Sequence, residues 1–390
     1  MLQQEDKPLY GYADVTIIPN PISNILSRSE CDPFLPTGTL PIFTAPMSSV
    51  VGMENFNEWR KNKIIPIAPR NVDWETRKNL LLSGEWIAIG LSGFQTHFIE
   101  YPITKDQPLK VCIDIANGHM REVLDMVEEA KKINPCLIVM AGNIANPETI
   151  KYYCESGIDF ARCSIGTGNA CITSSNTGVH YPLASLISES RKIRDAWEWE
   201  NKKKGTKIIA DGGIRGYGDV IKALALGADR VMIGGLFAGC LEACGEIKMS
   251  FKDVDSSREL YTGSTYNPSN FTIEYSEGVF YLRPTESYLR KYPSGLLRTK
   301  SNKIMVKLYR RFYGMASRQG QKDINGGVAE KTAEGIEKTI PITITLSGWV
   351  ENMIHYLRSA MSYMSVKTLE GIPQAEVRIM SPAAKGAINP

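Results

Sequence analysis

Eight short apolar runs that alternate with helical segments constrain the fold of this chain most strongly. The runs lie at residues 41–47, 64–68, 86–90, 110–116, 136–141, 158–162, 207–210 and 230–233. Helices are predicted between several of them, at 53–61, 120–132 and 217–226. Nearly continuous apolar strands separated by helices are typical of a parallel sheet covered on both faces. Eight such units predict an α/β fold, a (β/α)8 TIM barrel, rather than an open doubly wound sheet.

Charge and cysteine usage exclude several classes of protein. The net charge of +3 is small, so we expect no nucleic-acid partner and no attraction to a membrane surface. The eight cysteines are scattered without CxxC pairs, which indicates reduced thiols rather than a disulfide framework or a zinc site. The first residues lack the features of a signal peptide, and no apolar segment reaches the length of a membrane span. These observations predict a cytoplasmic protein.

Polar residues and glycines follow the predicted strands, where barrel enzymes carry their active sites. Asp114 ends the fourth strand, Asn143 the fifth and Asp211 the seventh. Glycine pairs follow the last two strands, at 212–213 and 234–235. Each pair alone is explained better by a tight turn. Because two pairs lie on adjacent strands and one follows an aspartate, we predict a nucleotide site, with backbone amides on the phosphate and Asp211 on the ribose.

The loop after the sixth strand contains Gly166, Gly168, Cys171 and Thr173. Glycines permit backbone paths that bring amides and carbonyls close to a ligand, and a cysteine on such a loop can act as a thiolate nucleophile. A linker with an inert buried cysteine explains an isolated motif of this kind better. The neighbouring strand ends favour the catalytic interpretation.

Many segments resemble landmarks of the IMP dehydrogenase and GMP reductase family, in the family's order. They lie at 27–30, 45–47, 111–118, 140–143, 166–173, 210–214, 312–315 and 333–336. The resemblance extends from about Asp14 to Tyr363 with one large gap. Segments 177–182, 235–239 and 326–330 resemble the reductase branch.

The resemblance implies a role for each matching residue. The catalytic residues are Cys171, Thr173 and Glu334. The substrate, a purine nucleoside monophosphate, is bound by Met47, Asn169, Asp211, Gly212, Gly213, Gly234, Gly235, Gly314, Met315 and Gly335. The nicotinamide cofactor is bound by Ser27, Arg28, Arg70, Asp114, Ile115, Ala116, Asn143, Arg162, Ile165 and Gly166. Backbone carbonyls of Gly166, Gly168 and Cys171 match the positions that bind a monovalent cation such as K+.

Two features favour the reductase over the dehydrogenase within this family. The segment from Arg70 to Glu85 is too short for the paired CBS modules that dehydrogenases usually carry. The segment from Ser317 to Glu334 lacks the Arg-Tyr pair that activates water in dehydrogenases. The implied reaction is NADPH-dependent reductive deamination of GMP to IMP and ammonia by a homotetramer. A CBS-less, NAD-dependent IMP dehydrogenase and a nucleotide-binding barrel without redox turnover remain alternatives.

The chain also departs from the family. The segment 330–334 is one residue shorter than the reductase pattern and lacks its Arg. Asn169 stands where Ser is common, and Ser48-Ser49 where Asp-Thr is common. These changes line the implied substrate pocket, so the preferred nucleotide can differ from plain GMP.

The gap in the resemblance is an insertion at 251–303, rich in Tyr and Ser. Alternating residues at 271–275 and 279–282 flank Ser276-Glu277-Gly278, a pattern that predicts a β-hairpin. We therefore expect a barrel domain built from 1–250 and 304–390 with a β-rich insertion after the eighth strand. Capping of the site, assembly and binding are all open roles for it.

Overall fold

A closed parallel sheet forms the centre of the molecule. The computed structural model describes residues 8–168, 171–252, 259–265, 267–276, 278–291, 304–327 and 332–388. The strand order is β2-β9-β8-β7-β6-β5-β4-β3. The Thr44 amide donates to the Ile65 carbonyl, and the Ile65 amide to the Ile42 carbonyl, both at 3.0 Å. These bonds join β2 to the residues just before β3 and close the sheet, so the predicted (β/α)8 barrel is confirmed.

The barrel strands correspond one to one with the predicted apolar runs. They are β2 (Ile42–Thr44), β3 (Ile67–Ala68), β4 (Trp86–Ile89), β5 (Lys110–Asp114), β6 (Ile138–Ile144), β7 (Phe160–Cys163), β8 (Lys207–Asp211) and β9 (Arg230–Ile233). One boundary differs in a way that affects the site. Strand β6 continues through Asn143 to Ile144, where the sequence predicted an end at 141, so Asn143 belongs to the sheet.

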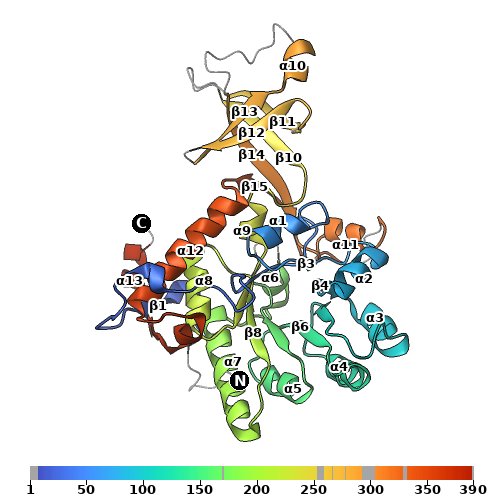
Figure 1. Cartoon of the computed structure of the whole chain (residues 1–390), viewed down its shortest axis with the longest axis vertical. Helices are drawn as coiled ribbons and strands as arrows, with labels where there is room; N and C mark the ends of the chain where they lie inside the picture. Colours follow the sequence, from blue (N-terminus) through green and yellow to red (C-terminus); the bar gives the residue numbers. More distant parts are fainter. Residues whose placement is uncertain are drawn as a thin grey trace.

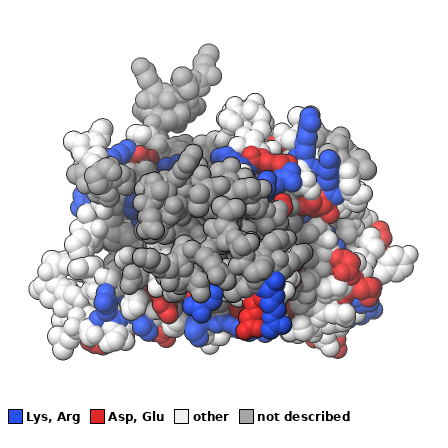
Figure 2. Space-filling view, turned by 90° about the horizontal axis from the view of Figure 1, so that it is seen from above, with Lys and Arg blue, Asp and Glu red and all other residues white. Residues whose placement is uncertain are grey.

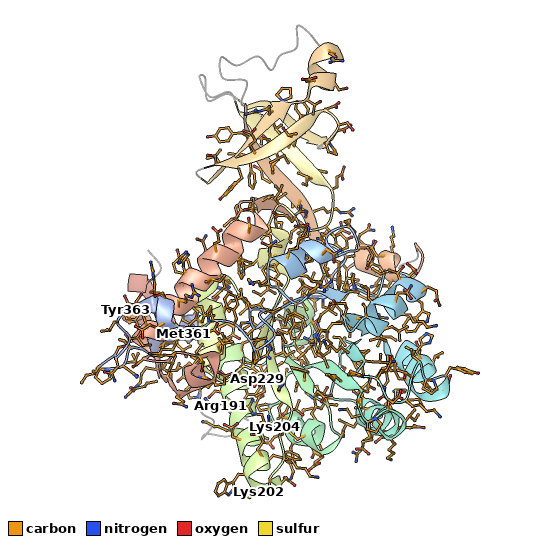
Figure 3. All side chains as sticks on the ribbon, in the orientation of Figure 1. Arg191, Lys202, Lys204, Asp229, Met361 and Tyr363 are labelled. Carbon is orange, nitrogen blue, oxygen red and sulfur yellow. The ribbon has the colours of Figure 1, made fainter. Side chains whose placement is uncertain are left out.

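Helices surround the barrel (Figure 1). They are α1 (Phe56–Lys61), α2 (Trp74–Leu82), α3 (Leu91–Phe94), a π-helix (Gln95–Glu100), α4 (Arg121–Ile133), α5 (Thr149–Glu155), α6 (Thr173–Thr177), α7 (Leu183–Asn201), α8 (Tyr217–Ala225), α9 (Gly235–Ala238) and α12 (Leu346–Tyr363). Helices α1, α4 and α8 confirm the three predicted from spacing. Lys202 and Lys204 lie just beyond α7, in the lower part of the view in Figure 3.

Alternating side chains divide the apolar core into two parts. In β4, Trp86 and Ala88 point into the barrel, whereas Ile87 and Ile89 pack outwards against the helices. Inside the barrel, Trp86 makes edge-to-face contacts with Phe43 and Phe160, with ring centroids 5.5 Å apart in both pairs. Both faces of each strand are therefore buried, which explains why the strands read as continuous apolar runs.

A second, antiparallel sheet projects from the barrel together with α10 (Figure 1). Its strands are β10 (Ile247–Lys252), β11 (Glu259–Thr265), β12 (Phe271–Ser276), β13 (Val279–Pro284), β14 (Ile304–Tyr313) and β15 (Glu337–Ile342), with α10 at Glu286–Lys291. Strands β12 and β13 pair from Phe271–Pro284 to Ser276–Val279, so the predicted hairpin is confirmed. Strand β14 pairs with β10, β13 and β15. The sheet thus includes residues on either side of the 251–303 insertion, and the division into domains stays a prediction.

Arg310 anchors the second sheet to the barrel. Its side chain, in β14, is almost fully buried and donates hydrogen bonds to the carbonyls of Ala238, Cys240 and Leu241 at 2.9, 2.6 and 2.8 Å. Burial lowers the pKa of Arg310 to about 10, so it remains charged at neutral pH. These hydrogen bonds hold β14 at the end of α9. Strand β14 leads directly into Gly314 and Met315.

The two ends of the described chain meet beside α12. Strand β1 (Val15–Ile18) pairs antiparallel with β16 (Glu376–Ile379). Short elements complete this region: 3-10 helices at Tyr12–Asp14, Arg28–Glu30 and Leu369–Gln374, and α13 (Pro382–Ile388). Among the helices of the described residues, none has the length and apolar character needed to cross a bilayer. Basic and acidic side chains are interspersed along the rim of the face seen in Figure 2, in keeping with the small net charge.

Candidate active site

The loop between β7 and α6 folds back on itself and presents Cys171. Gly166 has φ +73°, and a Cβ there would lie 2.4 Å from the Cβ of Ser174, so only glycine fits. The Ser174 hydroxyl donates to the Gly166 carbonyl at 2.9 Å, and the Cys171 amide to the Gly168 carbonyl at 2.9 Å. These bonds fix the loop on both sides of Cys171. Asn169, a predicted substrate residue, lies outside the described residues.

Cys171, Thr173 and Glu334 form a continuous hydrogen-bonded chain. The Cys171 thiol donates to the Thr173 hydroxyl at 3.2 Å, and this hydroxyl donates to Oε2 of Glu334 at 3.0 Å. All three residues are partly exposed, so a ligand can reach this hydrogen-bonded chain from solvent. The structure thus brings together the three predicted catalytic residues, and the donor–acceptor order leads from the thiol to the carboxylate.

Glu334 is held by its backbone from two sides. Its carbonyl accepts from the Ile172 amide at 2.9 Å, and its amide donates to the Ala316 carbonyl at 3.1 Å. Gly335, the next residue, forms an isolated antiparallel bridge with Cys171. The segment carrying Glu334 is therefore placed between the cysteine loop and the turn that follows β14.

Burial distinguishes Cys171 from other cysteines of the barrel. Burial raises the pKa of the Cys112 and Cys163 thiols to about 12, so both stay protonated at neutral pH. Burial also raises the pKa of Cys240 and Cys244. Because the thiolate is the nucleophile, these four residues are unsuited to covalent catalysis. Cys171 is partly exposed and has a hydroxyl beside its sulfur.

Arg162 connects two aspartates at the carboxyl ends of the strands. Its Nη1 lies 2.5 Å from Oδ1 of Asp114, and its Nη2 lies 2.9 Å from Oδ2 of Asp211. Asn143 Nδ2 donates to the same Asp211 oxygen at 2.7 Å. The Arg162 side chain is 7% exposed. Burial opposes its charge, but the carboxylates outweigh burial and raise the pKa of Arg162.

This network defines what Asp211 can offer a ligand. Oδ2 of Asp211 already accepts bonds from Asn143 and Arg162, whereas no described residue donates to Oδ1. Oδ1 is therefore the oxygen that can accept a hydrogen bond from a ligand. Arg162 and Asn143, predicted as cofactor residues, here orient Asp211, and a direct contact of either one with a cofactor stays a prediction.

The glycine pairs lie where neighbouring loops approach closely. Gly212 and Gly213 have φ values of +77° and +66°, and a Cβ at Gly213 would lie 2.5 Å from Leu183 Cδ1. A Cβ at Gly234 would lie 2.9 Å from Met47 Sδ. Gly235 begins α9. The loops after β2, β8 and β9 thus share one end of the barrel, the arrangement expected for a phosphate site.

The predicted cofactor residues fall into two groups. Arg70 donates to the Asp114 carbonyl at 3.3 Å, next to Ile115 and Ala116, and Ile165 lies just after β7, two strands away from β5 in the barrel. Ser27 and Arg28 are not brought to this group. Their 3-10 helix is tied through Glu30 to Lys367, beyond the C-terminal end of α12. A direct contact of Ser27 or Arg28 with the cofactor stays a prediction.

Two of the three carbonyls predicted to bind a cation already accept a hydrogen bond. The Gly166 and Gly168 carbonyls each accept one hydrogen bond, as described above. A carbonyl oxygen has two lone pairs, so one remains on each for a K+ ion. Within the described part of the chain, no cluster of three or more His, Cys, Asp or Glu side chains could hold a metal ion.

The sequence did not reveal a polar cluster beside Met47. Asp323 of α11 (Arg318–Ile324) accepts from Ser48 and from the Tyr313 hydroxyl, both at 2.7 Å. Ser49 donates to the Tyr313 carbonyl at 3.0 Å. Gly314 and Met315, predicted substrate residues, follow directly. The exchange of Asp-Thr for Ser48-Ser49 was the only sequence signal near this cluster, and it did not point to Asp323.

A family model and two relatives that match this chain point to the same protein family. The family model "IMP dehydrogenase / GMP reductase domain" matches residues 103–265. The chain is 32% identical over 300 residues to "GMP reductase" of Streptococcus pyogenes serotype M5 (strain Manfredo), covering 73% of this chain and 86% of the relative. It is 33% identical over 282 residues to "GMP reductase" of Streptococcus agalactiae serotype V (strain ATCC BAA-611 / 2603 V/R), covering 66% and 79%.

Proposed function

Because the chain belongs to the IMP dehydrogenase / GMP reductase family, we propose that it catalyses the NADPH-dependent reductive deamination of GMP, or of a closely related purine nucleotide, to IMP and ammonia. The observation that carries this proposal is the hydrogen-bonded chain from Cys171 through Thr173 to Glu334. Relatives named "GMP reductase" favour the reductive direction.

Cys171 is the proposed nucleophile. Its thiolate adds to carbon 2 of the purine, and loss of the exocyclic amine as ammonia leaves a thioimidate on the sulfur. The hydroxyl of Thr173 and the carboxylate of Glu334 are in line to take the thiol proton and to return a proton to the departing amine. Bound NADPH supplies the hydride that reduces carbon 2, and the Cys171 thiolate leaves as IMP forms.

The strand ends provide the proposed nucleotide contacts. Oδ1 of Asp211 accepts a ribose hydroxyl, and amides of the Gly212–Gly213 and Gly234–Gly235 segments bind the phosphate. Met47, Met315 and Gly335 surround the base, since they adjoin Gly234, Ser48 and Cys171. Asn169 stays in this set as a prediction from the resemblance.

The residues near Arg70 suit a dinucleotide cofactor. Arg70 offers a cation beside Asp114, Ile115 and Ala116, which are partly or fully exposed residues, and such a cation can bind a phosphate of the cofactor. These residues hold and orient the cofactor in the proposal. Use of NADPH rather than NADH, binding of K+ and assembly as a homotetramer are further parts of it.

Product analysis tests the proposal. The purified protein is incubated separately with GMP, IMP and XMP, each with both nicotinamide cofactors, in reduced and oxidised form. We expect conversion only of GMP with NADPH. Formation of XMP from IMP and NAD would instead establish a dehydrogenase, and nucleotide binding without any conversion would establish a binding protein.

A further inference from the structure

The cluster of Asp323, Ser48, Tyr313 and Gln319 (the Asp323 cluster) connects two parts of the site. One part is the loop that carries Met47 and Ser48, and the other is the turn that binds the backbone of Glu334. Asp323 Oδ2 accepts from both the Ser48 hydroxyl and the Tyr313 hydroxyl at 2.7 Å. Its Oδ1 accepts from Gln319 Nε2 at 2.8 Å. One carboxylate thus joins the loop after β2, the end of β14 and helix α11.

The donors in this cluster keep their protons at neutral pH. Burial, together with the hydrogen bond to Asp323, raises the pKa of Tyr313 to about 12. Ser48 and Tyr313 therefore both remain donors to the carboxylate, and charge-assisted bonds of this kind are stronger than neutral ones. A neutral side chain at 323 could not accept both donors equally well on one oxygen.

The turn at residues 314–317 is fixed by what surrounds it. Ser49 donates to the Tyr313 carbonyl at 3.0 Å, the Ser317 amide donates to the Gly314 carbonyl at 3.0 Å, and the Ser317 hydroxyl caps α11 by accepting from the Gly320 amide. A Cβ at Gly320 would lie 2.5 Å from the Gly314 carbonyl oxygen, so α11 packs directly on the turn. A shift of α11 must therefore move the turn.

The same turn holds the catalytic carboxylate. The Ala316 carbonyl accepts from the Glu334 amide at 3.1 Å, and Oε2 of Glu334 meets Thr173 at 3.0 Å. The contacts run without interruption from Asp323 through α11 and the turn to Glu334. Asp323 itself touches none of the residues placed in the catalytic chain.

We propose that Asp323 is a positioning residue: by joining Ser48 and Tyr313 to α11, it holds the 314–317 turn so that Glu334 stays within hydrogen-bond distance of Thr173. The role in turnover rests on the proposed reductase function, whereas the role in placing Glu334 does not. Misplacement of a catalytic group by 1 Å can cost on the order of 10²-fold in rate.

A double-mutant cycle in the full-length protein tests the role in turnover. Asp323→Ala should lower kcat roughly 10–100-fold. Asp323→Asn should lower it by less, because the amide oxygen can still accept from Ser48 and Tyr313, although without the charge and without an acceptor for Gln319. In a Glu334→Gln background, Asp323→Ala should change kcat by less than about twofold, since residues that act through one another are not additive. Asp125→Asn, an exposed residue on α4, is the control. Additive losses in the cycle would overturn the proposal.

Hydrogen exchange tests the placement without reference to turnover. The amides of Ile172 and Glu334 should exchange faster in Asp323→Asn than in the native protein, because both bond to the segment that Asp323 holds, and Asp125→Asn should match the native protein. Unchanged exchange at both amides would overturn the positioning role.

If native protein shows no GMP reduction, the proposed function fails, and exchange still decides the role of Asp323. Asp323→Asn carries the test if the alanine variant does not fold.

Discussion

Thr173 donates a 3.0 Å hydrogen bond to Oε2 of Glu334, a residue 161 positions later in the chain. The same hydroxyl accepts from the Cys171 thiol at 3.2 Å. One hydroxyl group thus connects the proposed nucleophile on the loop after β7 with a carboxylate carried between β14 and β15. The proposed chemistry depends on this connection, because proton transfer requires groups within hydrogen-bond distance.

Replacement of Cys171 by alanine should abolish turnover and leave nucleotide binding intact. The covalent route cannot proceed without the thiol, whereas Asp211 and the glycine pairs are unchanged. Turnover and calorimetric affinity for GMP are measured on the same preparation, with Cys136→Ala, an exposed cysteine outside the site, as the control. Substantial residual turnover in Cys171→Ala would remove Cys171 from its proposed role.

Asp211→Ala should weaken both nucleotide binding and folding. Loss of a charge-assisted bond to ribose costs about 1.5–3 kcal/mol of binding free energy. Breaking a buried ion pair costs about 3–5 kcal/mol of unfolding free energy, and we expect the lower end because Arg162 keeps Asp114. Calorimetry and denaturant unfolding measure the two effects. Native stability in Asp211→Ala would contradict the structural role inferred from the Arg162 network.

The phosphate of the nucleotide should supply a large share of its affinity. Amides at 212–213 and 234–235 can bind a phosphate but have no partner on a nucleoside. We expect GMP to bind at least about tenfold more tightly than guanosine, a difference of about 1.4 kcal/mol. Titration calorimetry with both compounds measures the difference, and equal affinities would rule out the phosphate site.

Glu334→Gln should slow departure of the amine more than hydride transfer. The substitution removes the ionisable member of the relay and nearly preserves the shape of the pocket, so a loss of about 10²–10⁴-fold in kcat is expected. With NADPH deuterated at the transferred position, the isotope effect on kcat should fall towards 1, because amine departure becomes limiting. Glu337→Gln, on β15, is the control. A large isotope effect retained in the slow variant would assign Glu334 to the hydride step.

Much of the fold could be predicted from the sequence because its signals are local. Each barrel strand is buried on both faces and reads as an apolar run, and the β12–β13 hairpin has its turn residues in place. The contact between Ser48 and Asp323 could not be predicted. These residues are 275 positions apart, and they meet only because β14 pairs with β10 and returns the chain to the barrel.

In the candidate site, too, local patterns could be predicted from the sequence and long-range contacts could not. Glycine spacing and strand ends indicated Cys171, Asp211 and the glycine pairs, since βα loops of a barrel share one face. The ion pairs of Arg162 depend on how four neighbouring strands, β5 to β8, are placed in the closed barrel, which no local pattern specifies. The family resemblance predicted Arg162 as a cofactor residue, which stays a prediction, but it did not reveal the two ion pairs with Asp114 and Asp211.

The stoichiometry of ammonia release tests the central claim most directly. Oxidation of IMP needs an activated water, and the chain lacks the Arg-Tyr pair that supplies it in dehydrogenases, whereas reduction needs only amine departure and hydride delivery. With GMP and NADPH, we predict one ammonia and one IMP for each NADPH consumed, measured in a single reaction, and no XMP from IMP and NAD. Steady XMP formation from IMP and NAD, without ammonia release from GMP, would contradict the account.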